Sequence, residues 1–187
     1  AVELDVKDEQ AVTELMRTIK SKHGSLDSLV NLAYCPHSKG VGELSGAEFG
    51  NALELNVGKA FHLARESKAL MKPGSSIILF SSMYGSVSPD PRIYQPPMKP
   101  NAIEYGVSKA GIEQMVRYLA VAWAPDGIRV NSVSPGPFPH PGQQKADPAF
   151  IERLAAKVPL GRIGKQHEVT GAVAFLVSDE ASYVTGH

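Results

Sequence analysis

Apolar residues recur along the chain at two spacings, and these spacings predict helices that alternate with strands. A one-sided stripe formed by Val12, Leu15, Met16 and Ile19 indicates a helix that begins after Asp8 and ends near Gly24. Short apolar runs predict buried strands, one holding Leu29, Val30 and Leu32 and two more within residues 75–82 and 127–136. Strands that alternate with helices typically form a parallel sheet covered on both faces, so we expect a single α/β domain with a doubly wound sheet.

Capping residues define the bounds of the next helix. Ser45 and Glu48 have the spacing of a capping box, in which each side chain binds a backbone N–H of the first turn. The predicted helix runs through Asn56 to about Met71, and Pro73 with Gly74 then ends it. Three further helices are expected over residues 105–123, 148–157 and 167–177, the second of them capped by Asp147.

One irregular segment, at about residues 86–101, interrupts this order. Residues 88–100 contain five prolines, which exclude a regular helix or a central strand. The segment is either a solvated surface loop or a wall of a substrate pocket, because it leaves from the end of the 75–82 strand.

Tyr105 and Lys109 carry the clearest candidate chemistry. They are four residues apart in a predicted helix, so the phenol and the ammonium share one helical face. A nearby cation favours the phenolate form and makes proton exchange at neutral pH practicable. Ser82 ends the strand before this helix, and Pro135 with Gly136 ends the strand after it. Open α/β sheets bind ligands at these carboxyl ends, so the three segments are expected to meet there.

Taken in order, these segments resemble the short-chain dehydrogenase/reductase family, whose Rossmann-type fold passes hydride between NAD(H) or NADP(H) and an alcohol or carbonyl. The resemblance spans nearly the whole chain. It rests on Leu4-Asp5-Val6, Asn31-Leu32-Ala33-Tyr34, Asn56, Ser82, Tyr105 with Lys109, Pro135-Gly136, and the closing stretch from Gly161 to Gly186.

The resemblance implies roles for individual residues. Tyr105 would exchange the proton, Ser82 would bind the reacting oxygen, and Lys109 would lower the tyrosine pKa and hold the nicotinamide ribose. Asn56 would hold a relay water, or else bond to the backbone as helix asparagines do. The implied cofactor-binding residues are Asp5, Val6, Asn31, Ala33, Tyr34, Tyr105, Lys109, Pro135, Gly136 and Phe138, and the implied substrate-binding residues are Ser82, Tyr84, Tyr94 and His140.

The chain departs from the family pattern in three places. Leu32 and Tyr34 replace an asparagine and a glycine of the turn after the fourth strand, so a ring occupies a position where the backbone normally approaches the cofactor. His140 stands where the family usually has a threonine, and it is either a substrate contact or an exposed loop residue. The proline-rich insertion is the third departure, and it suggests a sugar-like substrate. Tyr94 in that insertion is no rival to Tyr105, because Met98 rather than a lysine follows it at the required spacing.

The sequence therefore favours an NAD(P)-dependent oxidoreductase acting on a secondary alcohol or ketone. The main alternative is a dinucleotide-binding sensor or scaffold that kept the fold and lost turnover, which Leu32 and Tyr34 favour. An epimerase or dehydratase of the extended branch shares the Tyr-x-x-x-Lys pair, but the Pro135-Gly136 turn and the ending near Gly186 argue against it. A serine hydrolase is disfavoured because no Gly-x-Ser-x-Gly motif occurs.

Composition narrows the partners to a small-molecule substrate. Of the 187 residues 43% are hydrophobic, and 19 Lys and Arg balance 19 Asp and Glu, which gives no electrostatic case for nucleic acid or an acidic membrane. Cys35 is the single cysteine, so an internal disulfide is excluded and a cytoplasmic location is expected. No His/Cys/Asp cluster has metal-ligand spacing, no signal peptide opens the chain, and no apolar run approaches the ~20 residues that span a bilayer.

We also expect the chain to be an internal portion of a longer polypeptide. It begins beside what resembles the family's third strand, without the glycine-rich turn, and it stops before the last strand. The residue that discriminates NAD from NADP follows the second strand, so the choice cannot be read. A homodimer or homotetramer with a helix-to-helix interface is expected from the surplus of apolar residues on two helices, Phe61, Leu63, Met115, Val121 and Trp123.

Overall fold

The computed structural model describes residues 1–36 and 39–187 and contains a parallel three-stranded sheet. The strands β1 (Ser28–Asn31), β2 (Ser76–Phe80) and β3 (Arg129–Val133) lie in the order β1-β2-β3. In their register Val30 faces Ile78, and Ile78 faces Asn131. The three predicted strands are confirmed, but Leu32 is not part of the first: it follows β1 and its side chain is exposed.

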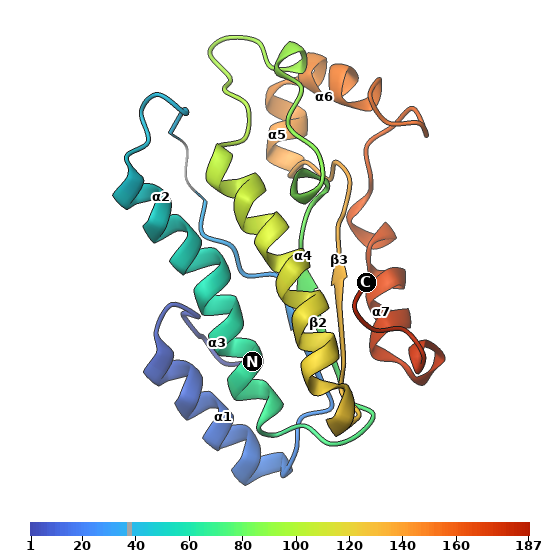
Figure 1. Ribbon diagram of the computed structural model, residues 1–187. Helices are drawn as coiled ribbons and strands as arrows, with labels where there is room; N and C mark the ends of the chain where they lie inside the picture. Colours follow the sequence, from blue (N-terminus) through green and yellow to red (C-terminus); the bar gives the residue numbers. More distant parts are fainter. Residues whose placement is uncertain (37–38) are drawn as a thin grey trace.

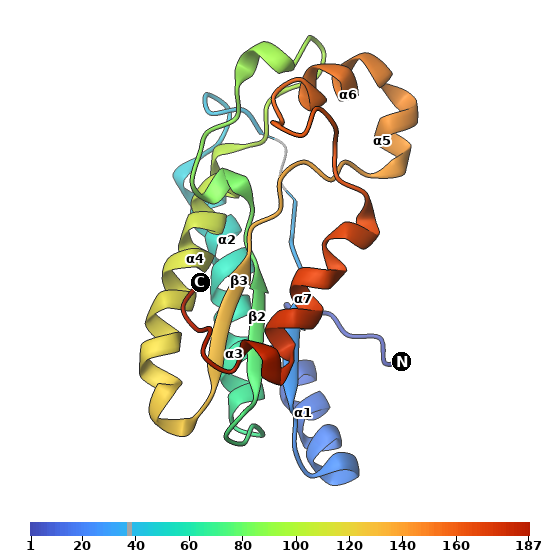
Figure 2. The ribbon, with the colours of Figure 1, turned by 90° about the vertical axis from the view of Figure 1, so that its right-hand side faces the viewer.

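Helices cover both faces of this sheet, as predicted (Figures 1 and 2). The helices α3 (Lys59–Lys68) and α4 (Ile103–Trp123) lie on one face, and α7 (Thr170–Val177) lies on the other. The main core fills the space between the sheet and the first pair, with Ile77, Leu79, Ile112, Val116 and Val130 among its buried members.

The helix α1 (Glu9–His23) packs against α3 through the predicted stripe. Asp8 caps it by accepting hydrogen bonds from the backbone N–H groups of Gln10 and Ala11, and Gly24 ends it with φ of 78°. Val12 and Met16 are buried in this contact together with Leu63. The expectation that Leu63 belongs to an exposed, shared face is therefore wrong.

The long helix predicted up to Met71 consists of three parts. The helix α2 (Gly46–Leu53) begins at the Ser45–Glu48 capping box, which is confirmed. A single π-helical turn, η1 (Glu54–Gly58), then joins it to α3 and contains Asn56. Such turns insert an extra residue and are frequent at functional sites.

The helices after β3 differ in part from the prediction. The helix α5 (Pro141–Ala146) was not expected, whereas α6 (Pro148–Ala155) begins at the expected cap, Asp147. The helix predicted over 167–177 begins with a 3₁₀ turn and continues as α7. The short 3₁₀ turns of the chain are η2 (Met83–Gly85), η3 (Pro91–Ile93), η4 (Ala124–Asp126), η5 (Gln166–Glu168) and η6 (Asp179–Ala181).

The last residues of the chain run back along β3. The backbone N–H of Gly186 donates to the carbonyl of Val130 at 2.8 Å, and the Asn131 amide donates to the carbonyl of Val184 at 2.9 Å. The guanidinium of Arg129, which is buried, donates to the carbonyl of Leu176 at the end of α7. These bonds fix α7 against the sheet.

The described residues contain neither a membrane-spanning helix nor a cluster of metal-ligating side chains. None of the helices is both long and apolar enough to cross a membrane. Within residues 1–36 and 39–187, no group of three or more His, Cys, Asp or Glu side chains is arranged to hold a metal ion.

Candidate active site

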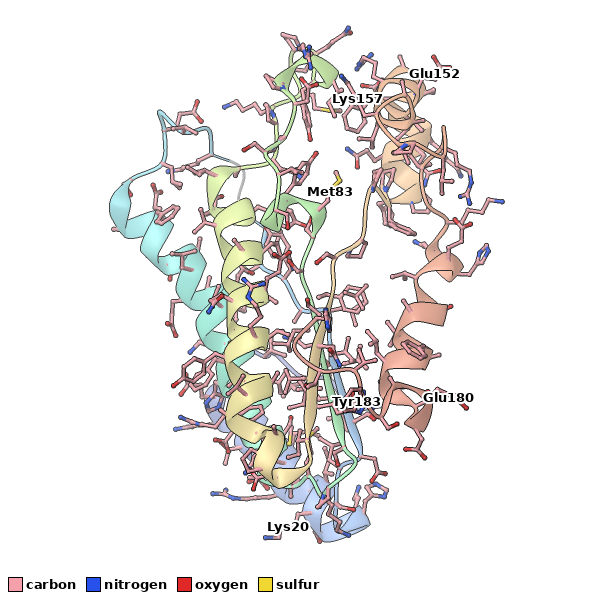
Figure 3. All side chains as sticks on the ribbon, turned by 45° about the vertical axis from the view of Figure 1, so that its right-hand side comes forward. Lys20, Met83, Glu152, Lys157, Glu180 and Tyr183 are labelled. Atoms are coloured by element: carbon pink, nitrogen blue, oxygen red, sulfur yellow. The ribbon has the colours of Figure 1, made fainter. Side chains whose placement is uncertain are left out.

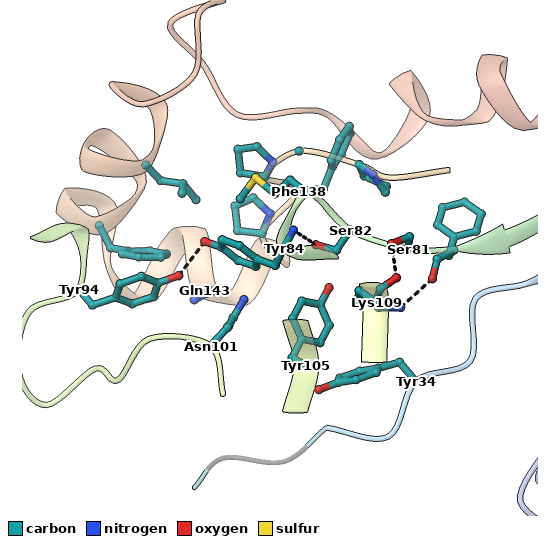
Figure 4. Close-up of a pocket in the computed structure, with 18 of the residues that line it drawn as sticks. Tyr34, Ser81, Ser82, Tyr84, Tyr94, Asn101, Tyr105, Lys109, Phe138 and Gln143 are labelled. Carbon is teal, nitrogen blue, oxygen red and sulfur yellow. Dashed lines mark hydrogen bonds between the residues drawn. The ribbon is translucent and has the colours of Figure 1, made fainter. Parts of the chain in front are cut away.

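A cavity of about 420 Å³ opens at the carboxyl end of the sheet (Figure 4). Its lining comes from the segment after β1, the end of β2 with η2, the proline-rich segment, the start of α4, the turn after β3, and α5 and α6. Ser82, Tyr105 and Lys109 all line it, so the structure brings together the three residues expected to perform the chemistry.

Lys109 lies at the inner end of this cavity and is buried. Its side chain is 7% exposed, and its Nζ donates a hydrogen bond of 2.8 Å to the backbone carbonyl of Phe80. Burial lowers the pKa of Lys109 to about 8. The same Nζ lies 5.6 Å from the ring centroid of Tyr105, so a cation is held beside the phenol.

Ser82 and its neighbour Ser81 have different surroundings. Ser82 lines the cavity, and its Oγ accepts a hydrogen bond from the backbone N–H of Tyr84 at 3.2 Å. The Ser81 hydroxyl instead faces α4, 2.9 Å from both the carbonyl of Lys109 and a carboxylate oxygen of Glu113. In the part of the chain that the structure describes, the Ser82 hydroxyl donates no hydrogen bond, so its hydrogen is available to a ligand in the cavity.

Glu113 is a positioning residue that the sequence analysis missed. Besides Ser81, its carboxylate accepts from the hydroxyls of Ser86 and Ser134, at 3.3 and 3.2 Å. The residue thereby connects α4 to the segments that follow β2 and β3. No motif marks it, since Ser134 is far from Ser81 and Ser86 in the sequence and none of the three is adjacent to Glu113.

Asn56 does not direct its amide at the cavity. Its Oδ1 accepts from the backbone N–H of Cys35 at 2.7 Å, and its Nδ2 donates to the carbonyls of Cys35 and Ala52 at 3.0 Å each. Of the two expectations for this residue, the structure shows the backbone-bonded one. The side chain fastens the segment after β1 to the helix behind it.

A second cavity, of about 350 Å³, lies beside the first and is lined by Asp5, Val6, Asn31, Ala33 and Tyr34 among others. Asn31 shapes the turn after β1, because its Oδ1 accepts from the backbone N–H of Ala33 at 3.0 Å. The hydrogen bond from the Lys7 backbone keeps the pKa of Asp5 below its usual range, so this carboxylate is ionised and exposed at the rim.

Tyr34 lines both cavities. Its ring meets the ring of Tyr105 edge to face, with centroids 5.0 Å apart, and the Nζ of Lys109 lies 5.3 Å from its centroid. Figure 4 shows the ring below both residues, reaching in from the segment after β1. Tyr34 was expected to alter cofactor binding, and its ring thus contacts Tyr105 and Lys109, the two residues expected to exchange and stabilise the proton.

The residues lining the two cavities fit the nicotinamide dinucleotide that the resemblance implies. The ten expected cofactor-binding residues line one cavity or the other. Lys109 donates one N–H of its ammonium to the Phe80 carbonyl, so two N–H groups remain that can donate to ribose hydroxyls. The ionised carboxylate of Asp5 can accept from an exocyclic amine or a hydroxyl.

The proline-rich segment forms the far wall of the larger cavity, although most of residues 88–100 are exposed. Tyr94 lines the cavity, and its hydroxyl lies 3.0 Å from that of Tyr84. Ile93 is buried against α6. Other lining residues, which no motif indicated, include Met83, Met98, Asn101, Gln143, Phe150 and Leu154. Asp147 predicted the start of the helix that carries Phe150 and Leu154 but not the surface that this helix covers.

His140 is the exception among the expected substrate contacts. Its side chain is exposed and does not line the cavity, and its Nδ1 accepts from the backbone N–H of Gly142 to cap α5. Pro141 at the first helical position favours this cap, since proline fixes the helical φ there. The expectation of a substrate contact at His140 is corrected to a capping role.

Known proteins resemble the chain over its whole length. A family model described as enoyl-(acyl carrier protein) reductase matches residues 1–187. An uncharacterized short-chain type dehydrogenase/reductase of Sinorhizobium fredii is 33% identical over 99% of this chain and 33% of its own length. A tropinone reductase homolog of Arabidopsis thaliana is 35% identical over 97% of this chain and 58% of its own. The chain thus spans less than two thirds of either relative.

Solved structures agree with these sequences. A short-chain dehydrogenase of Leptospira borgpetersenii with bound NAD⁺ superposes with a TM-score of 0.84 at 30% identity, covering 99% of this chain and 70% of that one. The parallel sheet and the helices on its two faces are therefore the Rossmann-type fold of that protein.

Proposed function

The chain belongs to the short-chain dehydrogenase/reductase family, and from this premise we propose that it is an NAD(P)-dependent oxidoreductase that interconverts a secondary alcohol and a ketone. The observation that carries the proposal is the convergence of Ser82, Tyr105 and Lys109 on one cavity. A hydroxyl, a phenol and a buried ammonium together can bind, protonate and stabilise one carbonyl oxygen.

In the reductive direction, the ketone takes up one hydride at carbon and one proton at oxygen. Bound NADH or NADPH supplies the hydride. The Ser82 hydroxyl donates a hydrogen bond to the carbonyl oxygen, and Tyr105 gives that oxygen its proton. The positive charge of Lys109 stabilises the negative charge left on the phenol oxygen, and its remaining N–H groups bind ribose hydroxyls.

Tyr105 must then recover a proton from solvent. A small cavity of about 10 Å³, room for about one water, is lined by Asn31, Asn56, Ser108 and Lys109. It supports a relay through Lys109 and a water, with Asn56 shaping the site rather than holding the water through its amide. The use of either NAD or NADP and a cytoplasmic location stay predictions.

Replacement of Tyr105 tests this function. Tyr105→Phe removes the proton donor and keeps the ring packed, so turnover of NADH or NADPH with a panel of ketones should fall by roughly 100-fold to 10,000-fold, with cofactor affinity nearly unchanged. Tyr118→Phe, on an exposed residue of the same helix, is the matched control. Activity of Tyr105→Phe within tenfold of the parent refutes the assignment.

The second candidate is a dinucleotide-binding sensor or scaffold. The ring of Tyr34 favours it, because this ring contacts Tyr105 and Lys109 and lies where the two cavities meet. The same assay separates the two functions. A sensor binds the cofactor but consumes none with any ketone, whereas an oxidoreductase forms one alcohol per cofactor oxidised.

We also propose a homodimer or homotetramer held by α3 and α4. Phe61, Tyr118 and Val121 are 42%, 72% and 78% exposed on these helices, whereas Met115 and Trp123 pack partly on the core. Burial of such side chains between two copies is favourable. Light scattering of the parent at micromolar concentration should give a multiple of the chain mass. Val121→Asp should lower the measured mass, because it places a charge in the interface. A parent that is monomeric contradicts the proposal.

A further inference from the structure

Two segments distant in sequence form one fixed wall of the active-site cavity. The guanidinium Nε of Arg153 in α6 donates to the carbonyl of Ile93 at 2.8 Å. Lys157 follows α6 and is labelled near its end in Figure 3. Its ammonium lies 3.0 Å from the carboxylate of Asp90. The ring of Tyr94 packs on that of Phe150 with centroids 5.5 Å apart. The proline-rich segment is therefore held in place by α6.

This wall carries a pair of hydroxyls. The oxygens of Tyr84 and Tyr94 are 3.0 Å apart and partly buried. One hydroxyl hydrogen bridges the two oxygens, which leaves the other hydrogen and several lone pairs for a further partner. Burial raises the pKa of Tyr84, so its hydroxyl stays neutral at physiological pH.

The hydroxyl pair faces the reaction centre across the cavity. Tyr84 follows Ser82 by two residues, and its ring meets that of Tyr105 edge to face with centroids 6.3 Å apart. In Figure 4 the Tyr84 ring points from the Ser82 side toward Tyr94, with the amides of Asn101 and Gln143 nearby. A ligand whose carbonyl reaches Ser82 and Tyr105 therefore has its opposite end beside the pair.

Hydrophobic residues make up about half of the lining, among them Met83, Met98, Phe138, Phe150 and Leu154 beside three prolines. Of its two cationic residues, Lys99 is paired with the carboxylate of Glu43, and Lys109 is assigned to the cofactor ribose. Among the described residues that line the cavity, none carries a carboxylate. The hydroxyls of a polyol that lay against these hydrophobic side chains would have no partners, at a cost for each.

We infer that the substrate is a cyclic ketone or alcohol with an apolar ring body and one further oxygen function opposite the reacting carbon, and that the hydroxyls of Tyr84 and Tyr94 bind this second oxygen. The inference rests on the proposed function for the reacting end of the cavity. The hydrophobic side chains of the lining contact the ring body, while the hydroxyl pair fixes its orientation. A misoriented or unsubstituted ring leaves the pair without its partner, which a site built for hydrogen bonding penalises.

A matched pair of probes tests this. The full chain is assayed with 4-(4-hydroxyphenyl)cyclohexanone and with 4-phenylcyclohexanone, which lacks only the distal hydroxyl. The parent should prefer the hydroxylated ketone by about tenfold in kcat/KM, the size of one net hydrogen bond. Tyr94→Phe keeps the ring on Phe150 and should abolish this preference, whereas Tyr118→Phe should retain it. Calorimetric titration of both ketones into Tyr105→Phe gives the same comparison without turnover.

The outcomes separate this inference from the proposed function. Turnover without a preference, or a preference that persists in Tyr94→Phe, overturns the inference and leaves the oxidoreductase intact. The parent could fail to turn over either ketone while Tyr105→Phe still binds the hydroxylated ketone more tightly and the double variant with Tyr94→Phe does not. That result refutes the oxidoreductase and supports the inference. Failure of both ketones to bind or react overturns the inference, as does a preference for a ketose such as fructose over both.

Discussion

The buried ammonium of Lys109 makes the stability of the protein depend on pH. Its pKa is about 8 in the folded chain, against an ordinary value of 10.5, because burial disfavours the charged form. Between these two values the unfolded chain binds more protons than the folded one, so stability rises with pH. Below pH 8 both states are protonated, and the cost of burying the charge is present in full.

Lys109→Met removes this pH dependence. Below pH 8 the free energy of unfolding of the variant should exceed that of the parent by an amount on the order of 2 kcal/mol, because the variant buries no charge. This advantage should disappear as pH rises from 8 to 10.5, where the parent loses its charge on folding. Urea unfolding of both proteins across this range measures the difference. A gap between them that stays constant with pH contradicts a depressed pKa at Lys109.

At the scale of elements, two glycines allow η2 to approach α4. A Cβ on Gly85 would lie 2.6 Å from a carboxylate oxygen of Glu113 and 3.0 Å from the backbone carbon of Lys109, and a Cβ on Gly106 would lie 3.0 Å from the carbonyl of Tyr84. This close approach sets the position of Ser82 and Tyr84 relative to Tyr105.

Gly85→Ala should therefore destabilise the protein by about 1 to 3 kcal/mol and reduce activity, because the backbone of Lys109 cannot yield as a side chain can. The matched control is Gly50→Ala within α2, where a Cβ would meet nothing within 4 Å. That substitution should stabilise by about 0.5 to 1 kcal/mol. Thermal unfolding measures both, and a Gly85→Ala protein as stable as Gly50→Ala refutes the packing argument.

The sequence predicts where helices begin better than it predicts the irregular turns and short helices between them. Asp8, the Ser45–Glu48 box and Asp147 mark helix starts because capping is a local interaction. The π-helical turn at Asn56 has no such local signal, since its amide binds Cys35 across 21 residues of sequence. The short helix α5 was missed because its cap is a histidine, His140, rather than one of the residues that usually cap helices.

At the scale of the molecule, the ends of three parallel strands bring the site together. Tyr105 and Lys109 could be predicted because they share one helix, and Ser82 because it ends a recognisable strand. For the proline-rich segment the sequence left a surface loop and a pocket wall both open, because the distinction depends on contacts with α6 such as the bond from Arg153 to Ile93. The same limit applies to Tyr34, whose contact with Tyr105 joins residues far apart in sequence.

Transfer of a labelled hydride tests the central claim most directly. The full chain is incubated with a ring ketone and with NADH or NADPH that carries deuterium on the transferable position, and the alcohol is analysed by mass spectrometry. The account predicts one deuterium on the carbinol carbon with the parent, and at least roughly 100-fold slower labelling with Tyr105→Phe at saturating cofactor. Unlabelled alcohol, no alcohol at all, or equal labelling by Tyr105→Phe would contradict it.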